Sequence, residues 1–183
     1  MTYNFLIPNF DNIPKELRSR PFVNWKAEGN PGEKPRKVPY LAGSHNTRAS
    51  STDPATWRTF EQALASYEEG GFTGIGVVLD GSGLVGVDID NCVSDGVLHA
   101  AALPFLNKLG AGYIEISPSG TGLRAFGYAE NLDSGAKGKF NGLEIELYST
   151  GRYLTVTGHC IKSEPIAPLN GFRELAERIR ADS

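Results

Sequence analysis

Seven short runs of aliphatic, β-branched and aromatic residues, separated by Gly, Pro, Asn or Asp, constrain the fold of this 183-residue chain most strongly. They span residues 22–25, 74–79, 84–89, 113–117, 123–128, 143–148 and 153–158. Runs of this length and composition predict β-strands. Because most connections between them are short, we expect largely antiparallel pairing. The segment Asp80-Gly81-Ser82-Gly83 predicts a hairpin between the second and third runs.

Helix signals lie before, between and after these runs, at residues 15–20, 53–67 and 98–109 and from about Gly171 onward. The segment from Asp53-Pro54 to Tyr67 is the clearest, because Asp is a favoured N-cap and Pro fits the first helical position. Residues 29–39 and 131–141 are basic and predict loops. We therefore expect an α+β fold in which a mixed, largely antiparallel sheet packs on helices, in a single domain over residues 1–183.

The charge distribution limits the partners of such a domain. The chain has 18 basic and 21 acidic residues, a net charge of -3, which excludes a surface that is basic everywhere. Residues 1–50 contain eight Lys and Arg against four Asp and Glu, whereas residues 51–100 contain one against eight. A nucleic-acid backbone would therefore be held by the first 50 residues, and the acidic quarter needs another explanation.

Other sequence features indicate a cytoplasmic protein. The two cysteines, Cys92 and Cys160, are too few for a disulfide framework, and no signal peptide pattern is seen. No apolar run approaches the roughly 20 residues of a membrane span. We expect a reducing cytoplasm and no membrane partner.

The acidic pair Asp88 and Asp90 ends the apolar run 84–89. Alternation in a strand places the two carboxylates on one face, about 6.6 Å apart along the strand. Such a pair can hold a divalent cation, although a solvent-facing strand end would show the same pattern.

A second alternating acidic set lies in residues 143–148. Glu144 and Glu146 share one face of this strand, opposite its leucines and isoleucine. The two glutamates could be the wet face of an amphipathic strand. If the strand neighbours that of Asp88, one of them supplies a third oxygen ligand for Mg²⁺ or Mn²⁺.

Residues 117–124, with the sequence SPSGTGLR, form a turn rich in Gly and hydroxyl side chains between two strands. Its backbone N–H groups could approach a phosphate chain, and Arg124 could bind its oxygens. An ordinary hairpin turn has the same composition. Arg152 and His159 flank the run 153–158 and could also reach an anion.

Taken in order, these segments resemble the catalytic core of the archaeo-eukaryotic primase superfamily, most closely the primase-polymerase domains of phage and plasmid replication proteins. The resemblance runs through KPRKVPY, ASSTDPATWRTFEQAL, GIGVVL, VGVDIDNC, SPSGTGLRAFG and IELYSTGRYLTVTGH. It implies the RRM-like core of that fold. It further implies a DNA primase and DNA-directed DNA polymerase that performs template-dependent nucleotidyl transfer on single-stranded DNA.

The resemblance also assigns roles to individual residues. It implies that Asp88, Asp90 and Glu146 are catalytic and bind Mg²⁺ or Mn²⁺, with Glu144 as the alternative third ligand. Many family members carry His at the position of Arg124, and arginine still supplies N–H donors and charge. The residues implied to bind the incoming NTP or dNTP are Lys37, Ser117, Ser119, Gly120, Thr121, Arg124, Arg152 and His159.

The expected partners are a template, a primer and a nucleotide. Family members often continue into a helical primase segment and a helicase, so a helicase domain is a further expected partner, and the chain can be the N-terminal part of a longer replication protein. Two other functions use similar residues. A metal-dependent nuclease also needs clustered carboxylates, and a non-catalytic single-strand-binding module could use the sheet as a platform.

Overall fold

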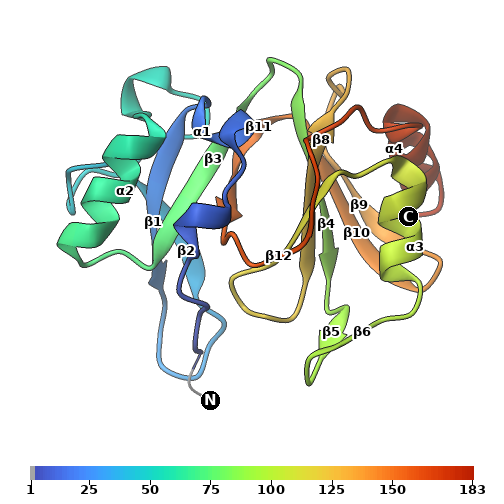
Figure 1. The fold of residues 1–183 in the computed structure, drawn as a ribbon, viewed down its shortest axis with the longest axis horizontal. Helices are drawn as coiled ribbons and strands as arrows, with labels where there is room; N and C mark the ends of the chain where they lie inside the picture. The colour runs from blue at the N-terminus through green and yellow to red at the C-terminus, as the bar shows by residue number, and fades with distance from the viewer. Residues whose placement is uncertain (1–2) are drawn as a thin grey trace.

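The computed structural model describes residues 3–183 as two antiparallel sheets flanked by helices (Figure 1). The first sheet has the strand order β11-β3-β1-β2 and the second β12-β7-β8-β4-β10-β9, and β5 pairs with β6. The strands are β1 (Phe22–Glu28), β2 (Arg36–Tyr40), β3 (Gly74–Asp80), β4 (Leu84–Asp90), β5 (Val93–Ser94), β6 (Val97–Leu98), β7 (Tyr113–Ile116), β8 (Leu123–Tyr128), β9 (Ala136–Phe140), β10 (Leu143–Tyr148), β11 (Thr150–Val156) and β12 (Cys160–Ser163). The helices are α1 (Lys15–Arg18), α2 (Phe60–Glu69), α3 (Ala102–Leu109) and α4 (Phe172–Ala181), with 3-10 turns η1 (Phe10–Asn12) and η2 (Pro54–Thr56). The α+β class expected from the sequence is confirmed.

Each sheet packs its own helices. In Figure 1, α1 and α2 lie beside the first sheet and α3 and α4 beside the second, so the other faces of the two sheets look toward each other. Leu154 of β11 occupies the space that a side chain at Gly86 of β4 would need, 2.1 Å from that Cβ position. The missing side chain of Gly86 therefore lets the two sheets approach closely.

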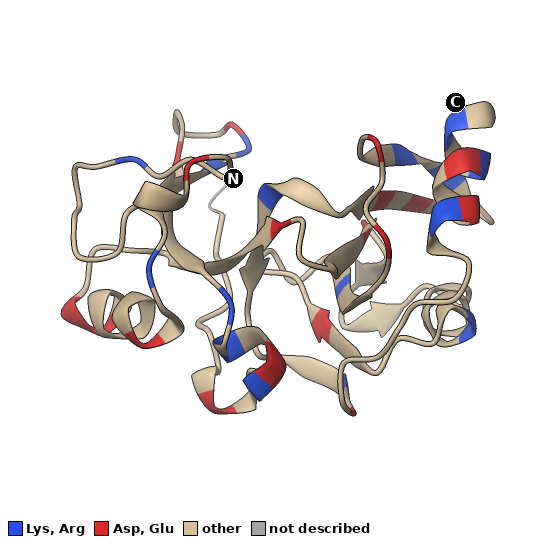
Figure 2. Ribbon diagram, turned by 90° about the horizontal axis from the view of Figure 1, so that it is seen from above, with Lys and Arg blue, Asp and Glu red and all other residues tan. Residues whose placement is uncertain are grey.

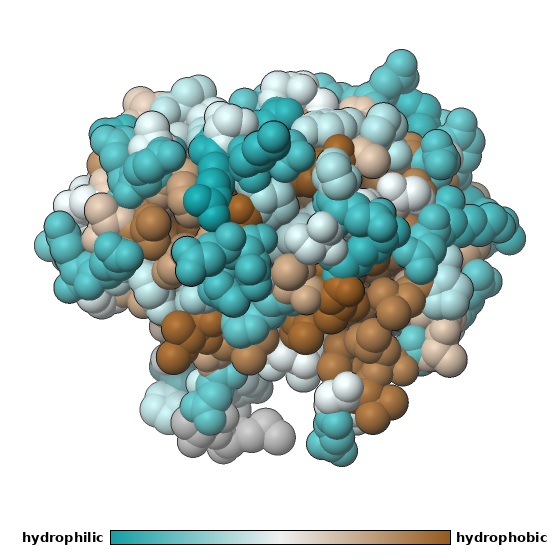
Figure 3. Space-filling model, viewed as in Figure 1, coloured by the Kyte–Doolittle hydropathy of each residue, from teal (hydrophilic) through white to brown (hydrophobic). Residues whose placement is uncertain are grey.

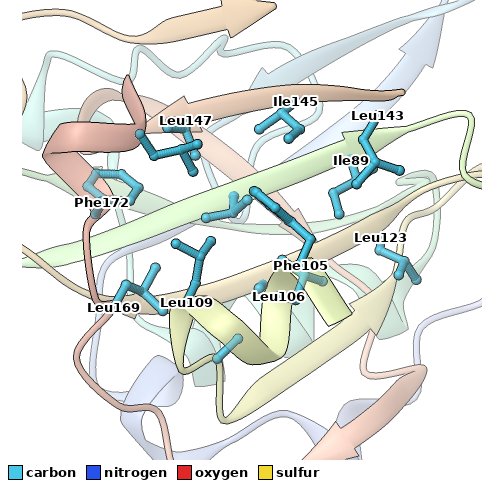
Figure 4. Close-up of a cluster of buried hydrophobic side chains, with 14 of the residues drawn as sticks. Ile89, Phe105, Leu106, Leu109, Leu123, Leu143, Ile145, Leu147, Leu169 and Phe172 are labelled. Carbon is cyan, nitrogen blue, oxygen red and sulfur yellow. The ribbon is translucent and has the colours of Figure 1, made fainter. Parts of the chain in front are cut away.

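Two apolar cores follow from the strand alternation. Val87 and Ile89 of β4 and Leu147 of β10 pack with Phe105 of α3 and Phe172 of α4, as Figure 4 shows for most of this cluster. The second core joins the first sheet and α2 to the inner face of the second sheet. Residues at even positions of β4 and β10 therefore face the first sheet, which places their acidic side chains between the sheets.

The predicted hairpin between residues 74–79 and 84–89 is wrong. β3 pairs with β1 and β11, whereas β4 pairs with β8 and β10 in the other sheet. Gly81 and Gly83 have φ of 86° and 105°, and Asp80 Oδ1 accepts from the Ser82 N–H, so this segment crosses between the sheets. Both strands are almost wholly buried, which two central strands require and an isolated hairpin does not.

The two predicted basic loops each contain a strand. β2 covers residues 36–40, at the end of the first predicted loop, and β9 covers residues 136–140 of the second. Both are at sheet edges, where one row of backbone groups is unpaired and lysines discourage further pairing. Their polar composition reflects this edge position.

The starts of two predicted helices also differ. Asp53 caps the 3-10 turn η2, and α2 begins only at Phe60, where Thr59 and Gln62 form a capping box. Helix α3 begins at Ala102, which leaves Pro104 in its first turn.

Charged residues of both signs occur along the whole ribbon in Figure 2. Lys and Arg are spread over both halves of the molecule among Asp and Glu (Figure 2). An apolar area surrounds the β5–β6 hairpin and the chain leading to α3, where Val97 is 69% exposed (Figure 3). Among residues 3–183, no helix has the length and apolar character needed to cross a bilayer.

Candidate active site

Four acidic side chains lie on adjacent strands of the second sheet. In the β4–β10 register Glu146 is opposite Asp88, and Glu144 is opposite Asp90. Directly opposed residues of antiparallel strands share a face, with Cβ atoms about 4.5–5.5 Å apart. The condition for a third oxygen ligand, that the strand of residues 143–148 neighbours that of Asp88, is therefore met.

The two glutamates differ in their surroundings. Glu146 is half-buried and lines a cleft of about 320 Å³ between the sheets, together with Asp88 and Asp90. Glu144 is exposed and accepts a hydrogen bond from Asn91 Nδ2 at 2.9 Å. Glu144 does not line this cleft, which favours Glu146 as the third carboxylate.

Basic side chains outnumber the acids in this cleft. Its basic lining residues are Lys34, Lys37, Arg124, Lys137 and Arg152. Five positive and three negative charges leave an excess of two positive charges. This balance suits a ligand that is itself strongly negative.

Most hydrogen-bond donors of Arg124 are used within the protein. Its Nε and Nη2 donate to the two carboxylate oxygens of Asp88, at 2.5 and 3.0 Å. Its Nη1 donates to the backbone oxygen and to Oγ1 of Thr155 on β11, both at 2.5 Å. These contacts use four of the five N–H donors of a guanidinium. Arg124 therefore lies in the cleft, but it ties Asp88 to the opposite sheet.

Glu146 is held by two neighbours. Lys137 Nζ lies 2.5 Å from its Oε1, and the Tyr148 hydroxyl donates to its Oε2 at 2.6 Å. Burial raises the pKa of Glu146, but the hydrogen bonds from Lys137 and Tyr148 outweigh that effect and leave the pKa below its usual value. The Arg152 guanidinium lies 4.5 Å from the centre of the Tyr148 ring. Glu146 is thus ionised and fixed in orientation.

The charge of Asp90 is compensated less than that of Glu146. Asp90 forms no ion pair among the residues that the structure describes. Loss of surrounding water raises the pKa of Asp90, the negative charges of Glu146 and Asp88 raise it further, and the positive charges of Lys137 and Lys34 offset only part of this rise. On the cation side, burial lowers the pKa of Lys37, as do the positive charges of Arg124 and Lys34. Asp90 and Lys37 are therefore a carboxylate and an ammonium group in the cleft that have no ion-pair partner among the described residues.

The donor set fits a hard divalent cation, although it is not a ready-made site. Within residues 3–183, no three His, Cys, Asp or Glu side chains are close enough together to hold an ion as they stand. Carboxylate oxygens are nevertheless the ligands that Mg²⁺ and Mn²⁺ prefer. A cation beside Asp90 would relieve the repulsion that raises the pKa of this residue.

The Gly- and hydroxyl-rich turn lies just beyond the cleft. Asp88 pairs with Arg124 and Ile89 with Leu123, so residues 117–122 continue from the strand end that carries Asp90. The Ser119 hydroxyl is 3.2 Å from that of Ser117 and 2.8 Å from that of Thr121, and none of the three lines the cleft. The structure thus brings Lys37, Arg124 and Arg152 together with the acids, and places Ser117, Ser119, Gly120 and Thr121 beside them.

His159 also lies outside the cleft-lining set. Its Nε2 is 2.5 Å from the backbone oxygen of Ile7, and its own backbone oxygen accepts from the Ile116 N–H. His159 is therefore anchored to the N-terminal segment and to β7.

Several residues of this region were missed from the sequence. Lys34 and Lys137 lie in segments interpreted as loops, and Thr155 and Tyr153 lie in an apolar run. Glu115 is fully buried and accepts from the Tyr113 hydroxyl and from the N–H groups of Thr157 and Gly158. A single acid inside an apolar run was the only signal for Glu115.

Comparisons with known proteins identify a relative of the chain. No protein-family model matches the chain. It is similar to a DNA primase-polymerase of Nitratiruptor phage NrS-1, with 35% identity over 142 residues. The similarity covers 75% of this chain and 19% of that protein, so the chain matches about a fifth of the length of this relative.

Proposed function

Since this relationship assigns the chain to the DNA primase-polymerases, we propose that it catalyses template-dependent nucleotidyl transfer on single-stranded DNA, forming or extending primers. One observation carries the proposal. Asp88, Asp90 and Glu146 face a single cleft whose other charged residues are all cations. A triphosphate bound to metal needs this combination of carboxylates and surrounding positive charge.

The three carboxylates are the residues that would hold Mg²⁺ or Mn²⁺. Divalent cations in such a site lower the pKa of an attacking hydroxyl and neutralise a leaving pyrophosphate. Asp90 is the acid whose carboxylate is free to bind a cation, because Asp88 is paired with Arg124 and Glu146 with Lys137. The Lys137 side chain is 74% exposed and can swing into solvent, whereas that of Arg124 is buried. Lys137 is therefore the cation that a metal ion would displace from Glu146.

Two cations of the cleft, Lys37 and Arg152, would bind the nucleotide. In the reaction, a primer 3′-hydroxyl attacks the α-phosphate of an NTP or dNTP, one P–O bond forms and another breaks, and pyrophosphate leaves. Lys37 and Arg152 keep N–H donors for the phosphates, since neither forms an ion pair among residues 3–183. The turn with Ser117, Ser119, Gly120 and Thr121, together with His159, is proposed as the outer part of this nucleotide site. Arg124 is proposed to act through Asp88.

The experiment that tests this function compares matched variants. Purified protein is incubated with a primed single-stranded template, labelled nucleotides and Mg²⁺ or Mn²⁺. We expect incorporation by the wild type and by Glu144→Gln, and loss of about 100-fold or more in Asp90→Asn and Glu146→Gln. Incorporation by Asp90→Asn at the wild-type rate would overturn the assignment. Cleavage of labelled DNA by the wild type with metal and no nucleotide would instead identify a nuclease.

A further inference from the structure

A second charged hollow lies away from the cleft, on the side of the first sheet that carries α1 and α2. It has a volume of about 600 Å³ and lies between the end of α1 and the segment that joins η2 to α2. Arg18, Arg20, Arg58 and Trp57 line it, with Glu61 as its only acid. We call this hollow the arginine groove. Its excess of two positive charges suits an anionic ligand.

The arginines of this groove are held in place without being neutralised. Arg58 Nη1 donates to the backbone oxygens of Ala55 and Trp57, at 3.0 and 2.8 Å. Arg20 Nη1 donates to Ser82 Oγ at 2.5 Å. Each guanidinium has five N–H donors, so both keep donors for a ligand. None of the three arginines pairs with a carboxylate in the part of the chain that the structure describes.

Arg18 has a different role in the groove. Its Nε and Nη2 donate to backbone oxygens of residues 10–13, and its guanidinium lies 5.0 Å from the centre of the Phe60 ring. These contacts join α1 to the start of α2. Arg18 therefore supports the wall of the groove, and Arg20 and Arg58 keep more free N–H donors than Arg18 does.

Trp57 supplies an aromatic surface beside these cations. Its Nε1 donates to the backbone oxygen of Ser50 at 2.7 Å, which fixes the indole, and the side chain is half-buried. An aromatic ring beside arginines is the combination that binds single-stranded nucleic acid, because bases stack on the ring while the arginines bind phosphates.

The arginine groove is connected to the cleft through one loop. Ser51 Oγ donates to the backbone oxygen of Gly151 at 3.0 Å, and the next residue, Arg152, lines the cleft. Trp57 hydrogen-bonds to Ser50, the residue before Ser51. The loop of residues 50–57 therefore contacts β11 beside Arg152 at one end and carries Trp57 at the other.

We propose that the arginine groove binds the single-stranded template outside the cleft, with phosphates on Arg20 and Arg58 and a base stacked on Trp57. The inference rests on the proposed function for the identity of the strand. Its binding energy is independent of metal and nucleotide, because no carboxylate of the cleft takes part.

Trp57 also gives the proposal a direct readout. The chain has two tryptophans, and the other, Trp25, is 2% exposed. Titration with an oligo(dT) in the absence of metal and nucleotide should therefore quench the fluorescence of Trp57, and Trp57→Phe should remove the change. Quenching by dTTP alone at the same phosphate concentration would overturn the proposal in favour of a mononucleotide site.

Matched charge variants test the arginines. Arg20→Gln with Arg58→Gln should weaken oligo(dT) binding and lower the slope of log K against log salt by about 1.4, since each phosphate contact contributes about 0.7 for single strands. Lys108→Gln with Arg173→Gln removes the same charge from α3 and α4 and should leave both quantities unchanged. Equal binding by the two double variants would overturn the proposal.

A wild-type measurement covers the case in which the groove variant fails to fold. Ultraviolet irradiation with a bromodeoxyuridine-substituted oligonucleotide should crosslink to the peptide that contains Trp57. Crosslinks confined to other peptides would overturn the proposal. Nucleotide incorporation on a short primed template, measured separately, reports on the cleft, so failure of the groove and failure of the proposed function give different results.

Discussion

Arg124 and Asp88 form a bidentate ion pair across neighbouring strands, with distances of 2.5 Å from Nε to Oδ1 and 3.0 Å from Nη2 to Oδ2. The two residues are only 9% and 8% exposed. Arg124 also donates to Thr155 of the facing sheet. The orientation of a proposed metal ligand is therefore set by a side chain that bridges the two sheets.

Arg124→Ala is expected to lower the free energy of unfolding by about 3–5 kcal/mol, because Asp88 is left charged and unpaired in the interior. Urea unfolding followed by circular dichroism measures the loss. Asp88→Asn in the Arg124→Ala background should recover part of it, since a neutral amide needs no counter-ion. A wild-type unfolding midpoint for Arg124→Ala would show that Arg124 does not stabilise Asp88.

Asp90→Asn is expected to separate stability from metal binding. The substitution removes repulsion from Glu146 and Asp88, so the Tm without metal should equal or exceed that of the wild type. Mn²⁺ should raise the Tm of the wild type by mass action but not that of Asp90→Asn. Scanning calorimetry with and without Mn²⁺ measures both effects.

Glu146→Gln serves as the control for that experiment. It weakens the contact with Lys137, whose side chain is 74% exposed, so the pair is worth about 1 kcal/mol and the Tm without metal should fall slightly rather than rise. A rise in Tm for both variants with Mn²⁺ would mean that neither residue binds the ion.

The sequence was most informative where alternation decides which face a side chain occupies. The runs 123–128 and 143–148 coincide with β8 and β10, and the acids of residues 143–148 share a face, as predicted. Alternation carries no information on which strands become neighbours, and for this reason the hairpin over residues 74–89 was wrongly predicted. The same limit hid the division into two sheets, in which β11 of the first sheet supplies a partner of Arg124 on the second.

Glu115 shows a further limit of the sequence. Its partners Thr157 and Gly158 are about 40 residues away, and no local pattern connects them. Such a contact becomes visible only once β7 and the chain after β11 lie side by side. The hydrogen-bond donors to a buried carboxylate therefore depend on tertiary packing, whereas the set of residues on one face of a strand follows from the local sequence.

Glu115→Gln is expected to destabilise the fold by about 1–3 kcal/mol, because three donors point at the carboxylate and an amide can accept on one atom only. Burial raises the pKa of Glu115, against the opposing hydrogen bonds from Tyr113 and Gly158. A raised pKa means that the folded state holds the proton more tightly than the unfolded state. The pH-dependent part of the stability that Glu115 contributes is therefore complete below its ordinary pKa of 4.5 and is lost as the pH rises through the raised pKa.

Urea unfolding of both proteins over a range of pH tests this sign. The difference in unfolding free energy between wild type and Glu115→Gln should grow as the pH falls toward 4.5. A difference that shrinks toward acid pH would mean that the donors around Glu115 outweigh its burial.

Gly76→Ala is expected to disturb the cleft from the opposite wall. A Cβ at Gly76 would lie 2.5 Å from Cδ2 of Tyr153 and 3.0 Å from the backbone oxygen of Leu154. Tyr153 lines the cleft, and its hydroxyl donates to the backbone oxygen of Lys37. The ring must therefore move, which should cost about 1–3 kcal/mol of stability and raise the nucleotide KM by displacing Lys37.

In a Tyr153→Ala background the added methyl meets only the backbone of Leu154, so most of that stability cost should vanish. A double-mutant cycle in urea measures the coupling, and an equal cost of Gly76→Ala in both backgrounds would show that the glycine is required by the strand and not by Tyr153.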